Sequence, residues 1–362
     1  MQNKLLTVVV PVYKVEKYIN KCLDSLIVSD EQMSLLEVIV VNDGTPDNSA
    51  IMAKEYEKKY PQTFRVIDKE NGGHGSAWNR GVQEATGKYL RFLDSDDWLS
   101  NFSDFIGKLE SCNSDLIFTD VHCYHEDTKG SDFFRNTKLV PMKELNTNTF
   151  DWYSVRPLYR GSNYTNFHAC TYKTLLLKAH SPLFLEKIFY DDEILMVMPL
   201  CTADTFTYFN IVLYNYLLGR EGQSVNNNVR AKNLGFLVKS EKAMIDFYHT
   251  HPVQSKSKDA ELCYILNYRI KMLIVELLLL PYQDSKRMMN DFISFIQDRF
   301  PKYDGGILYK IYKISYPTCW LIYHHIRPLW AYFKINILKK CEYYLSTNST
   351  ILVEAIVFIP ST

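Results

Sequence analysis

Residues 87–97 read Gly-Lys-Tyr-Leu-Arg-Phe-Leu-Asp-Ser-Asp-Asp, an apolar β-type run that ends in three carboxylates. Crowding Asp94, Asp96 and Asp97 into four residues is electrostatically costly unless a cation offsets their repulsion. Oxygen ligands suit Mg²⁺ or Mn²⁺, which can also bridge to the phosphates of a substrate. The alternative interpretation is a solvated acidic turn or a helix N-cap, where Asp is favoured. The flanking sequence has to decide between the two.

Outward from this stretch, apolar β-type runs alternate with helix-like segments. The expected strands span residues 6–10, 38–41, 64–67, 89–93 and 116–119, and the expected helices span 16–27, 47–60 and 76–85. This alternation predicts an α/β fold with a mostly parallel sheet, flanked by helices in right-handed crossovers. Such sheets bind ligands at the carboxyl ends of their strands. The polar motifs of the chain stand just after the expected strands, where that rule predicts a site.

Two more polar motifs follow strand-like runs. Asp43 comes directly after the second expected strand, and residues 71–76 (Asn-Gly-Gly-His-Gly-Ser) precede an expected helix. Glycine permits positive φ and close backbone approach, and a Gly-rich turn at a helix N-terminus can bind phosphate. The turn lacks the G-x-G-x-x-G spacing of a dinucleotide site, and the chain has no P-loop motif. A plain turn therefore stays the alternative.

Taken in order, these motifs resemble those of the family 2 glycosyltransferases, which have the GT-A fold. The matching segments are residues 9–13, 37–45, 71–81 and 87–97. The match is strong over roughly residues 5–100, patchier over 167–225 and absent after about residue 230. Each motif is weak alone, but their succession is specific. The resemblance implies a Rossmann-like GT-A domain.

The resemblance also implies roles for individual residues. Asp94 and Asp96 are expected to hold Mn²⁺ or Mg²⁺ on the diphosphate of a nucleotide sugar, with Asp94 also near the ribose. Arg220 is expected to close over the pyrophosphate, which suits a bidentate guanidinium. The alternative interpretation of Tyr13 is a packed aromatic residue. For His74 it is a capping residue, and for Arg220 it is a surface ion pair. The residues expected to bind the nucleotide sugar are Pro11, Val12, Tyr13, Asp43, Gly73, His74, Arg80, Asp94, Ser95 and Arg220.

A second acidic motif, Phe-Tyr-Asp-Asp-Glu at residues 189–193, resembles the Glu-Asp motif of the family, with Asp191 in place of Glu. By this match Asp192 is the expected general base and Asp191 its catalytic neighbour. The shorter Asp191 leaves Asp191 or Glu193 open as the working acid. A solvated helix start is the alternative interpretation.

Composition limits the remaining classes. The formal net charge of zero argues against whole-chain attraction to nucleic acid. The eight cysteines include no C-x-x-C pair, so we expect free thiols in a reducing cytoplasm. The N-terminus does not resemble a signal peptide, and no segment reaches the ~18 apolar residues of a spanning helix.

The C-terminal part reads differently from the rest. We expect a boundary near residue 228, with a GT-A nucleotide-sugar-binding and catalytic domain at 1–228 and a mainly helical region at 229–362. Residues 302–340 carry seven Lys or Arg against one acid, interleaved with aromatic residues. This composition is typical of a segment at a membrane surface, and an aromatic-rich packed helical domain is the alternative.

Together these expectations describe an inverting, metal-assisted glycosyltransferase at the inner face of the cell membrane. It would move a sugar from a UDP-type donor to a glycan or lipid-linked glycan in cell-surface polysaccharide synthesis, such as capsule or exopolysaccharide; homo-oligomerisation is left open. The competing hypothesis is a catalytically silent subunit that binds a sugar nucleotide or a glycan. A nucleotidyltransferase is disfavoured because no Gly-rich basic loop follows the first strand.

Overall fold

The computed structural model describes residues 4–125, 135–137, 145–147, 167–219, 227–303, 309–310, 312, 316–318 and 320. The chain divides into two compact units, one formed by Met1–Leu273 with Asp291–Tyr303 and the other by Ile274–Asn290 with Asp304–Thr362. The candidate active site lies within the first unit. The domain boundary expected near residue 228 stays a prediction.

The first unit is built on one mixed sheet, in the strand order β3-β2-β1-β4-β9-β6-β10-β5, with β7 paired to β6 and β8 to β10. Strands β1 to β4 are mutually parallel, as are β6 and β10, whereas β9 runs antiparallel between β4 and β6. The predicted succession of parallel strands is therefore confirmed. The strands are β1 Leu6–Val12, β2 Leu36–Asn42, β3 Phe64–Asp68, β4 Tyr89–Phe92, β5 Trp98–Leu99, β6 Leu116–His125, β7 Arg135–Thr137, β8 Leu145–Thr147, β9 Cys170–Lys173 and β10 Phe206–Leu218.

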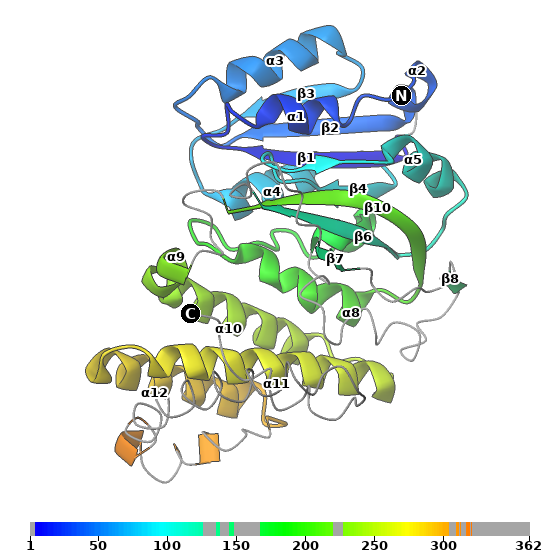
Figure 1. Cartoon of the computed structure of the whole chain (residues 1–362). Coiled ribbons are helices and arrows are strands. Elements are labelled where there is room, and N and C mark those ends of the chain that lie inside the picture. Colours follow the sequence, from blue (N-terminus) through cyan, green and yellow to red (C-terminus); the bar gives the residue numbers. More distant parts are fainter. Residues whose placement is uncertain are drawn as a thin grey trace, which may run out of the picture. The chain divides into compact units, whose positions relative to one another are not determined.

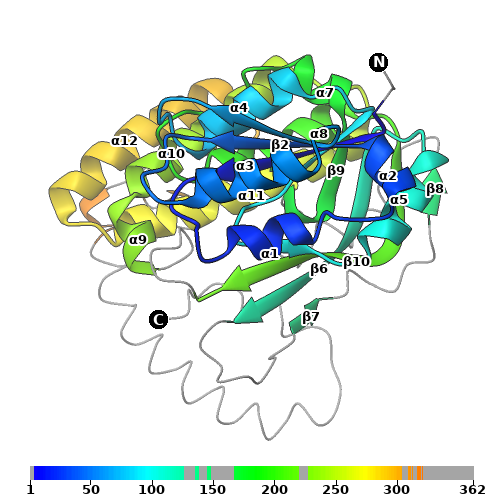
Figure 2. The same ribbon diagram turned by 90° about the horizontal axis from the view of Figure 1, so that it is seen from above.

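Helices flank the sheet, with α1 and α3 on one side of it and α4 on the other (Figures 1 and 2). Within the described part of the chain, no helix is long and apolar enough to cross a bilayer. The helices are α1 Ile19–Asp24, α2 Asp30–Leu35, α3 Ser49–Lys59, α4 His74–Glu84, α5 Phe102–Glu110, α7 Thr174–Lys178, α8 Met198–Thr202, α9 Asn227–Lys232, α10 Leu234–Thr250, α11 Lys256–Leu278 and α12 Tyr282–Arg299, with 3-10 turns η1 Phe167–Ala169 and η2 Asp191–Met196.

Strand β1 is longer than the sequence predicts. It continues through Pro11, which pairs with Val41 of β2, and ends at Val12. A proline near the end of a strand removes only one ladder N–H, so the strand tolerates it there. This extension carries Val12 and Tyr13 to the edge of the sheet at which the site lies.

Helix α4 packs closely on β1 because Gly81 has no side chain. A Cβ at Gly81 would lie 2.2 Å from Cγ1 of Val9. The same helix buries Trp78, whose ring stacks on Phe92 of β4 at 4.2 Å and meets Phe184 edge-on at 5.1 Å. These contacts fix the N-terminus of α4 beside the carboxyl ends of β1 and β4, and so determine where the Gly-rich turn lies.

Candidate active site

A cavity of about 830 Å³ opens at the carboxyl ends of β1, β2 and β4. Both predicted acidic motifs contribute to its wall, as does the Gly-rich turn. Arg80 does not line this cavity, because its exposed side chain pairs with Glu84 at 2.9 Å, and Arg220 lies outside the described residues. The predicted site residues that line the cavity are Pro11, Val12, Tyr13, Asp43, Gly73, His74, Asp94, Ser95, Asp96, Asp191 and Asp192.

Buried Asp43 binds the Gly-rich turn. Its carboxylate accepts hydrogen bonds from the backbone N–H groups of Gly72 at 2.9 Å and Gly73 at 2.8 Å, and from Nζ of Lys69 at 2.6 Å. Gly73 has φ of +86°, a conformation that glycine adopts at little cost. Asp43 therefore shapes the turn at the start of α4, a structural role that the sequence did not predict for it.

The acidic turn after β4 is pinned onto β10. The N–H of Asp97 donates to the carbonyl of Asp94 at 3.0 Å, which closes the turn. The carboxylate of Asp97 accepts from the hydroxyl of Tyr214 at 2.6 Å and from the N–H of Leu217 at 2.7 Å. Burial and the charges of Asp96 and Asp94 raise the pKa of Asp97 well above its ordinary value. The repulsion expected from the sequence is therefore present, and a bound cation would relieve it.

His74 connects the two acidic motifs. Its Nδ1 lies 3.0 Å from Oδ2 of Asp191, and its Nε2 lies 3.1 Å from Oδ1 of Asp94. Removal from water disfavours the charged imidazole, but the carboxylates of Asp191 and Asp94 outweigh that effect and raise the pKa of His74 well above its ordinary value. A protonated His74 donates to both carboxylates, so the residue does more than cap the turn.

The acids of the second motif lie in the turn η2, and α4 holds the segment that precedes it. Asn79 of α4 donates to the carbonyl of Phe184 at 2.8 Å and accepts from the N–H groups of Leu183 and Phe184 at 3.0 Å. Burial, together with the charges of Asp191 and Glu193, raises the pKa of Asp192 to about 8. A carboxyl whose pKa lies near the working pH is suited to accept a proton during a reaction.

Glu193 has a partner that the sequence did not predict. Arg269 of α11 forms ion pairs with Glu193 and with Glu241 of α10, the latter at 2.7 Å. Glu241 is 1% exposed in its side chain, so both the charge and its partner are largely removed from water. Arg269 also lines the cavity, as do Arg230 and Phe236. Helices from beyond residue 228 thus contribute directly to this site.

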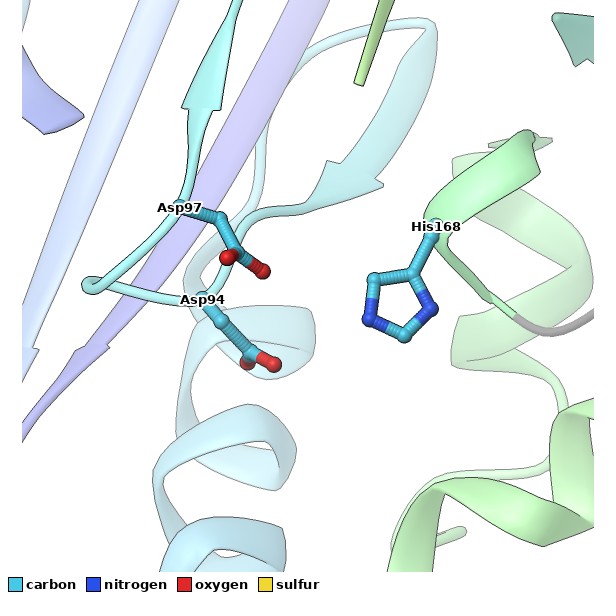
Figure 3. Close-up of side chains that lie close together, drawn as sticks. All are labelled: Asp94, Asp97 and His168. Carbon is cyan, nitrogen blue, oxygen red and sulfur yellow. The ribbon is translucent and has the colours of Figure 1, made fainter. Parts of the chain in front are cut away.

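His168 is a second cavity residue that the sequence analysis missed. Ligand atoms of Asp94, Asp97 and His168 lie within 4.8 Å of one another, and Figure 3 shows the imidazole facing the two carboxylates. Burial lowers the pKa of His168 to about 4, which leaves the ring neutral near pH 7. Two carboxylates and a neutral imidazole are a chemically suitable donor set for a divalent cation. Asp96, predicted as a ligand, lines the same cavity but lies outside this cluster.

Comparison with known proteins identifies the fold and the reaction class. Residues 7–171 match the family model described as glycosyl transferase family 2. The chain contains a family 2 glycosyltransferase domain. It is 28% identical over 314 residues to EpsJ, an uncharacterized glycosyltransferase of Bacillus subtilis, and the match covers 80% of this chain and 84% of EpsJ. It is 25% identical to the minor teichoic acid biosynthesis protein GgaB of the same organism, over 89% of this chain but only 34% of GgaB.

Among solved structures, residues 1–349 of Staphylococcus aureus TarS in complex with UDP superpose with a TM-score of 0.61 at 18% identity, over 82% of each chain. At this identity the likeness concerns the fold, and it agrees with the GT-A prediction. The acidic cavity of this family 2 glycosyltransferase lies at the carboxyl ends of the parallel strands, where the sequence placed its polar motifs. The family-model match and the glycosyltransferase relatives confirm the prediction of a glycosyltransferase.

Proposed function

We propose that this glycosyltransferase moves a sugar from a UDP-type nucleotide sugar to an acceptor hydroxyl, with inversion at the anomeric carbon. The observation that carries the proposal is that two acidic motifs, separated by almost a hundred residues in the sequence, line one cavity. One of them follows β4 and is suited to the diphosphate. The other contains Asp192, whose raised pKa suits a base.

The donor side of the cavity is formed by β1, β2 and the turn before α4. Tyr13 is 44% exposed beside Pro11 and Val12, so its ring is accessible to the nucleobase of a bound donor. The turn presents the N-terminus of α4, which favours negative charge such as that of a diphosphate. TarS, which shares the fold, has been crystallised with UDP and with UDP-GlcNAc, and a donor of the same class fits this arrangement.

The proposed reaction includes a divalent cation, because without one the carboxylates of the acidic turn would repel the diphosphate of the donor. Asp94 and Asp96 are the ligands that the family resemblance implies, and the structure adds Asp97 and His168 beside Asp94. When bound, Mn²⁺ or Mg²⁺ would offset the negative charge that develops on the departing diphosphate.

In the proposed reaction, Asp192 accepts the proton of the acceptor hydroxyl as its oxygen attacks the anomeric carbon. The new C–O bond forms on the face opposite the diphosphate, the old C–O bond breaks, and its electron pair leaves with the diphosphate. His74 orients Asp191 next to Asp192 through its contact at 3.0 Å. This base catalysis is expected to contribute on the order of 10²–10⁴-fold to the rate.

A panel of nucleotide sugars, each with Mn²⁺ and with or without EDTA, tests the donor and the cation together. A ligand that binds only the folded protein raises its melting temperature by mass action. We expect one UDP-sugar to raise it with Mn²⁺, to do so less with EDTA, and to release UDP when the acceptor is present. Asp96→Ala should lose the Mn²⁺-dependent part of the shift. Donor binding without UDP release, whichever acceptor is supplied, would favour the silent-subunit hypothesis instead.

We further propose that the acceptor is a glycan or lipid-linked glycan at the inner face of the membrane. The relatives support a cell-surface polymer, because GgaB is named for teichoic acid biosynthesis. Most of residues 302–340, the basic and aromatic segment, lies outside the described residues. Sedimentation of the full chain with anionic and with neutral vesicles tests the membrane contact: binding to anionic vesicles that weakens with salt supports it, and no binding to either contradicts it.

A further inference from the structure

His168 is a buried side chain of the first unit, and both of its polar atoms are unsatisfied among the described residues. It is 5% exposed, and neither ring nitrogen has a hydrogen-bond partner among the described residues. A buried polar atom without a partner is costly, and such atoms in folded proteins call for an explanation such as an ion. The other cavity histidine, His74, contacts carboxylates through both nitrogens. The protein thus provides hydrogen-bond partners for both ring nitrogens of His74 and, among the described residues, for neither nitrogen of His168.

The surroundings of His168 hold its ring in one orientation. Fully buried Arg91 of β4 donates hydrogen bonds to the backbone carbonyls of His168 and Cys170, the latter at 3.2 Å. The ring of Phe167 stacks on the imidazole at 3.9 Å, and the rings of Tyr214 and Tyr216 lie at 4.8 Å and 4.4 Å. The buried guanidinium of Arg91 thus positions the backbone around His168, and the surrounding rings determine the direction of the imidazole.

The distances leave space for an ion between His168 and the acidic turn. Ligand atoms of His168, Asp94 and Asp97 lie within 4.8 Å of one another, yet no hydrogen bond joins the ring to either carboxylate. A metal ion about 2.0–2.2 Å from each ligand separates opposite ligands by roughly 4 Å. The cluster thus needs only a small contraction to coordinate an ion. Figure 3 shows the ring directed toward both carboxylates across this gap.

We propose that His168 is a nitrogen ligand of the divalent cation at the acidic turn, and that it makes the site select a transition-metal ion such as Mn²⁺ over Mg²⁺. Imidazole suits transition metals, whereas Mg²⁺ prefers oxygen ligands and retains its water. The inference rests on the proposed function in one respect, namely that a cation binds at this turn. Asp94 is a ligand both in the family resemblance and in this inference. Asp97 is an additional carboxylate ligand, and Tyr214 and Leu217 orient it.

The test measures coordination directly and does not use catalysis. Pulsed electron paramagnetic resonance of the full chain with Mn²⁺ and UDP detects a directly bound imidazole nitrogen through its coupling to the electron spin. We expect that coupling in the unaltered protein and its loss in His168→Phe, a variant that keeps an aromatic ring on Phe167. The Mn²⁺ dissociation constant should rise by at least the 10–100-fold seen when only an outer partner of a ligand is removed, and the Mg²⁺ constant by much less.

His251→Phe serves as the matched control, because His251 also stacks on a phenylalanine, Phe247 at 4.0 Å, and does not line the cavity. It should retain the nitrogen coupling and the Mn²⁺ affinity. Bound Mn²⁺ without nitrogen coupling in the unaltered protein would overturn the role of His168 while leaving the proposed transfer reaction intact. Coupling that persists in His168→Phe would assign the nitrogen to another residue and overturn the inference as well. Transfer that proceeds unchanged in EDTA, with no Mn²⁺ bound, would reject the cation site itself.

Discussion

Replacing Asn79 by alanine should destabilise the first unit and displace the second acidic motif. The side chain is 4% exposed and makes three hydrogen bonds, two to Phe184 and one to Leu183. At about 1 kcal/mol for each neutral bond, Asn79→Ala should cost about 3 kcal/mol of unfolding free energy. At an unfolding entropy of about 2.1 cal/mol/K per residue, that corresponds to a fall of about 5 °C in the melting temperature of the first unit.

The assay is urea denaturation of the variant beside Gln83→Ala, which alters an exposed residue of the same helix. The control should stay within about 0.5 kcal/mol of the unaltered protein, as surface substitutions usually do. Because residues 183 and 184 precede η2, we also expect Asn79→Ala to lower the transfer rate more than the affinity for the donor. A loss of less than about 1 kcal/mol would show that Asn79 does not determine where the acidic motif lies.

Three further predictions concern burial and charge. Arg269→Met leaves the carboxylate of Glu193 without its buried partner, and should lower the free energy of unfolding by about 3–5 kcal/mol in urea denaturation. An unchanged urea midpoint of unfolding would show that these ion pairs do not stabilise the protein. Gly81→Ala should cost about 1–3 kcal/mol because its Cβ meets Val9 at 2.2 Å, and Val9→Ala should recover part of that cost in a double-mutant cycle. Without metal, native Asp192 with its pKa of about 8 keeps a proton that the unfolded chain loses above about pH 4. Stability therefore falls as pH rises from about 4 to about 8, and Asp192→Asn should raise the melting temperature more at pH 8 than at pH 5.

The parts of the fold that could be predicted are those that depend on local pattern. The apolar runs ending at Val41 and Leu93 form strands, and the acids that follow them line one cavity, because parallel strands bring their carboxyl ends together. The family resemblance predicted Asp191 and Asp192 as catalytic residues, and both line the same cavity as the acidic turn. None of this required knowledge of a contact between distant residues.

What sequence reasoning missed depends on tertiary contacts. His168 lies in a short segment without a motif. The one sequence signal is Arg91, a charged residue within an otherwise apolar strand, which in the structure binds the backbone of His168. Arg269 lies on α11, beyond the reach of the family resemblance, so its pairing with Glu193 had no local signal. Arg80 was expected to approach phosphate; in the structure it pairs with Glu84, one helical turn away, and the phosphate contact stays a prediction.

The initial rate of sugar transfer by Asp192→Asn tests whether Asp192 removes the proton of the acceptor hydroxyl. The rate should be measured at saturating donor and Mn²⁺, together with donor affinity by calorimetry. If Asp192 is the base, the rate should fall on the order of 10²–10⁴-fold while the donor affinity is retained. A variant that transfers sugar at the full rate would contradict it.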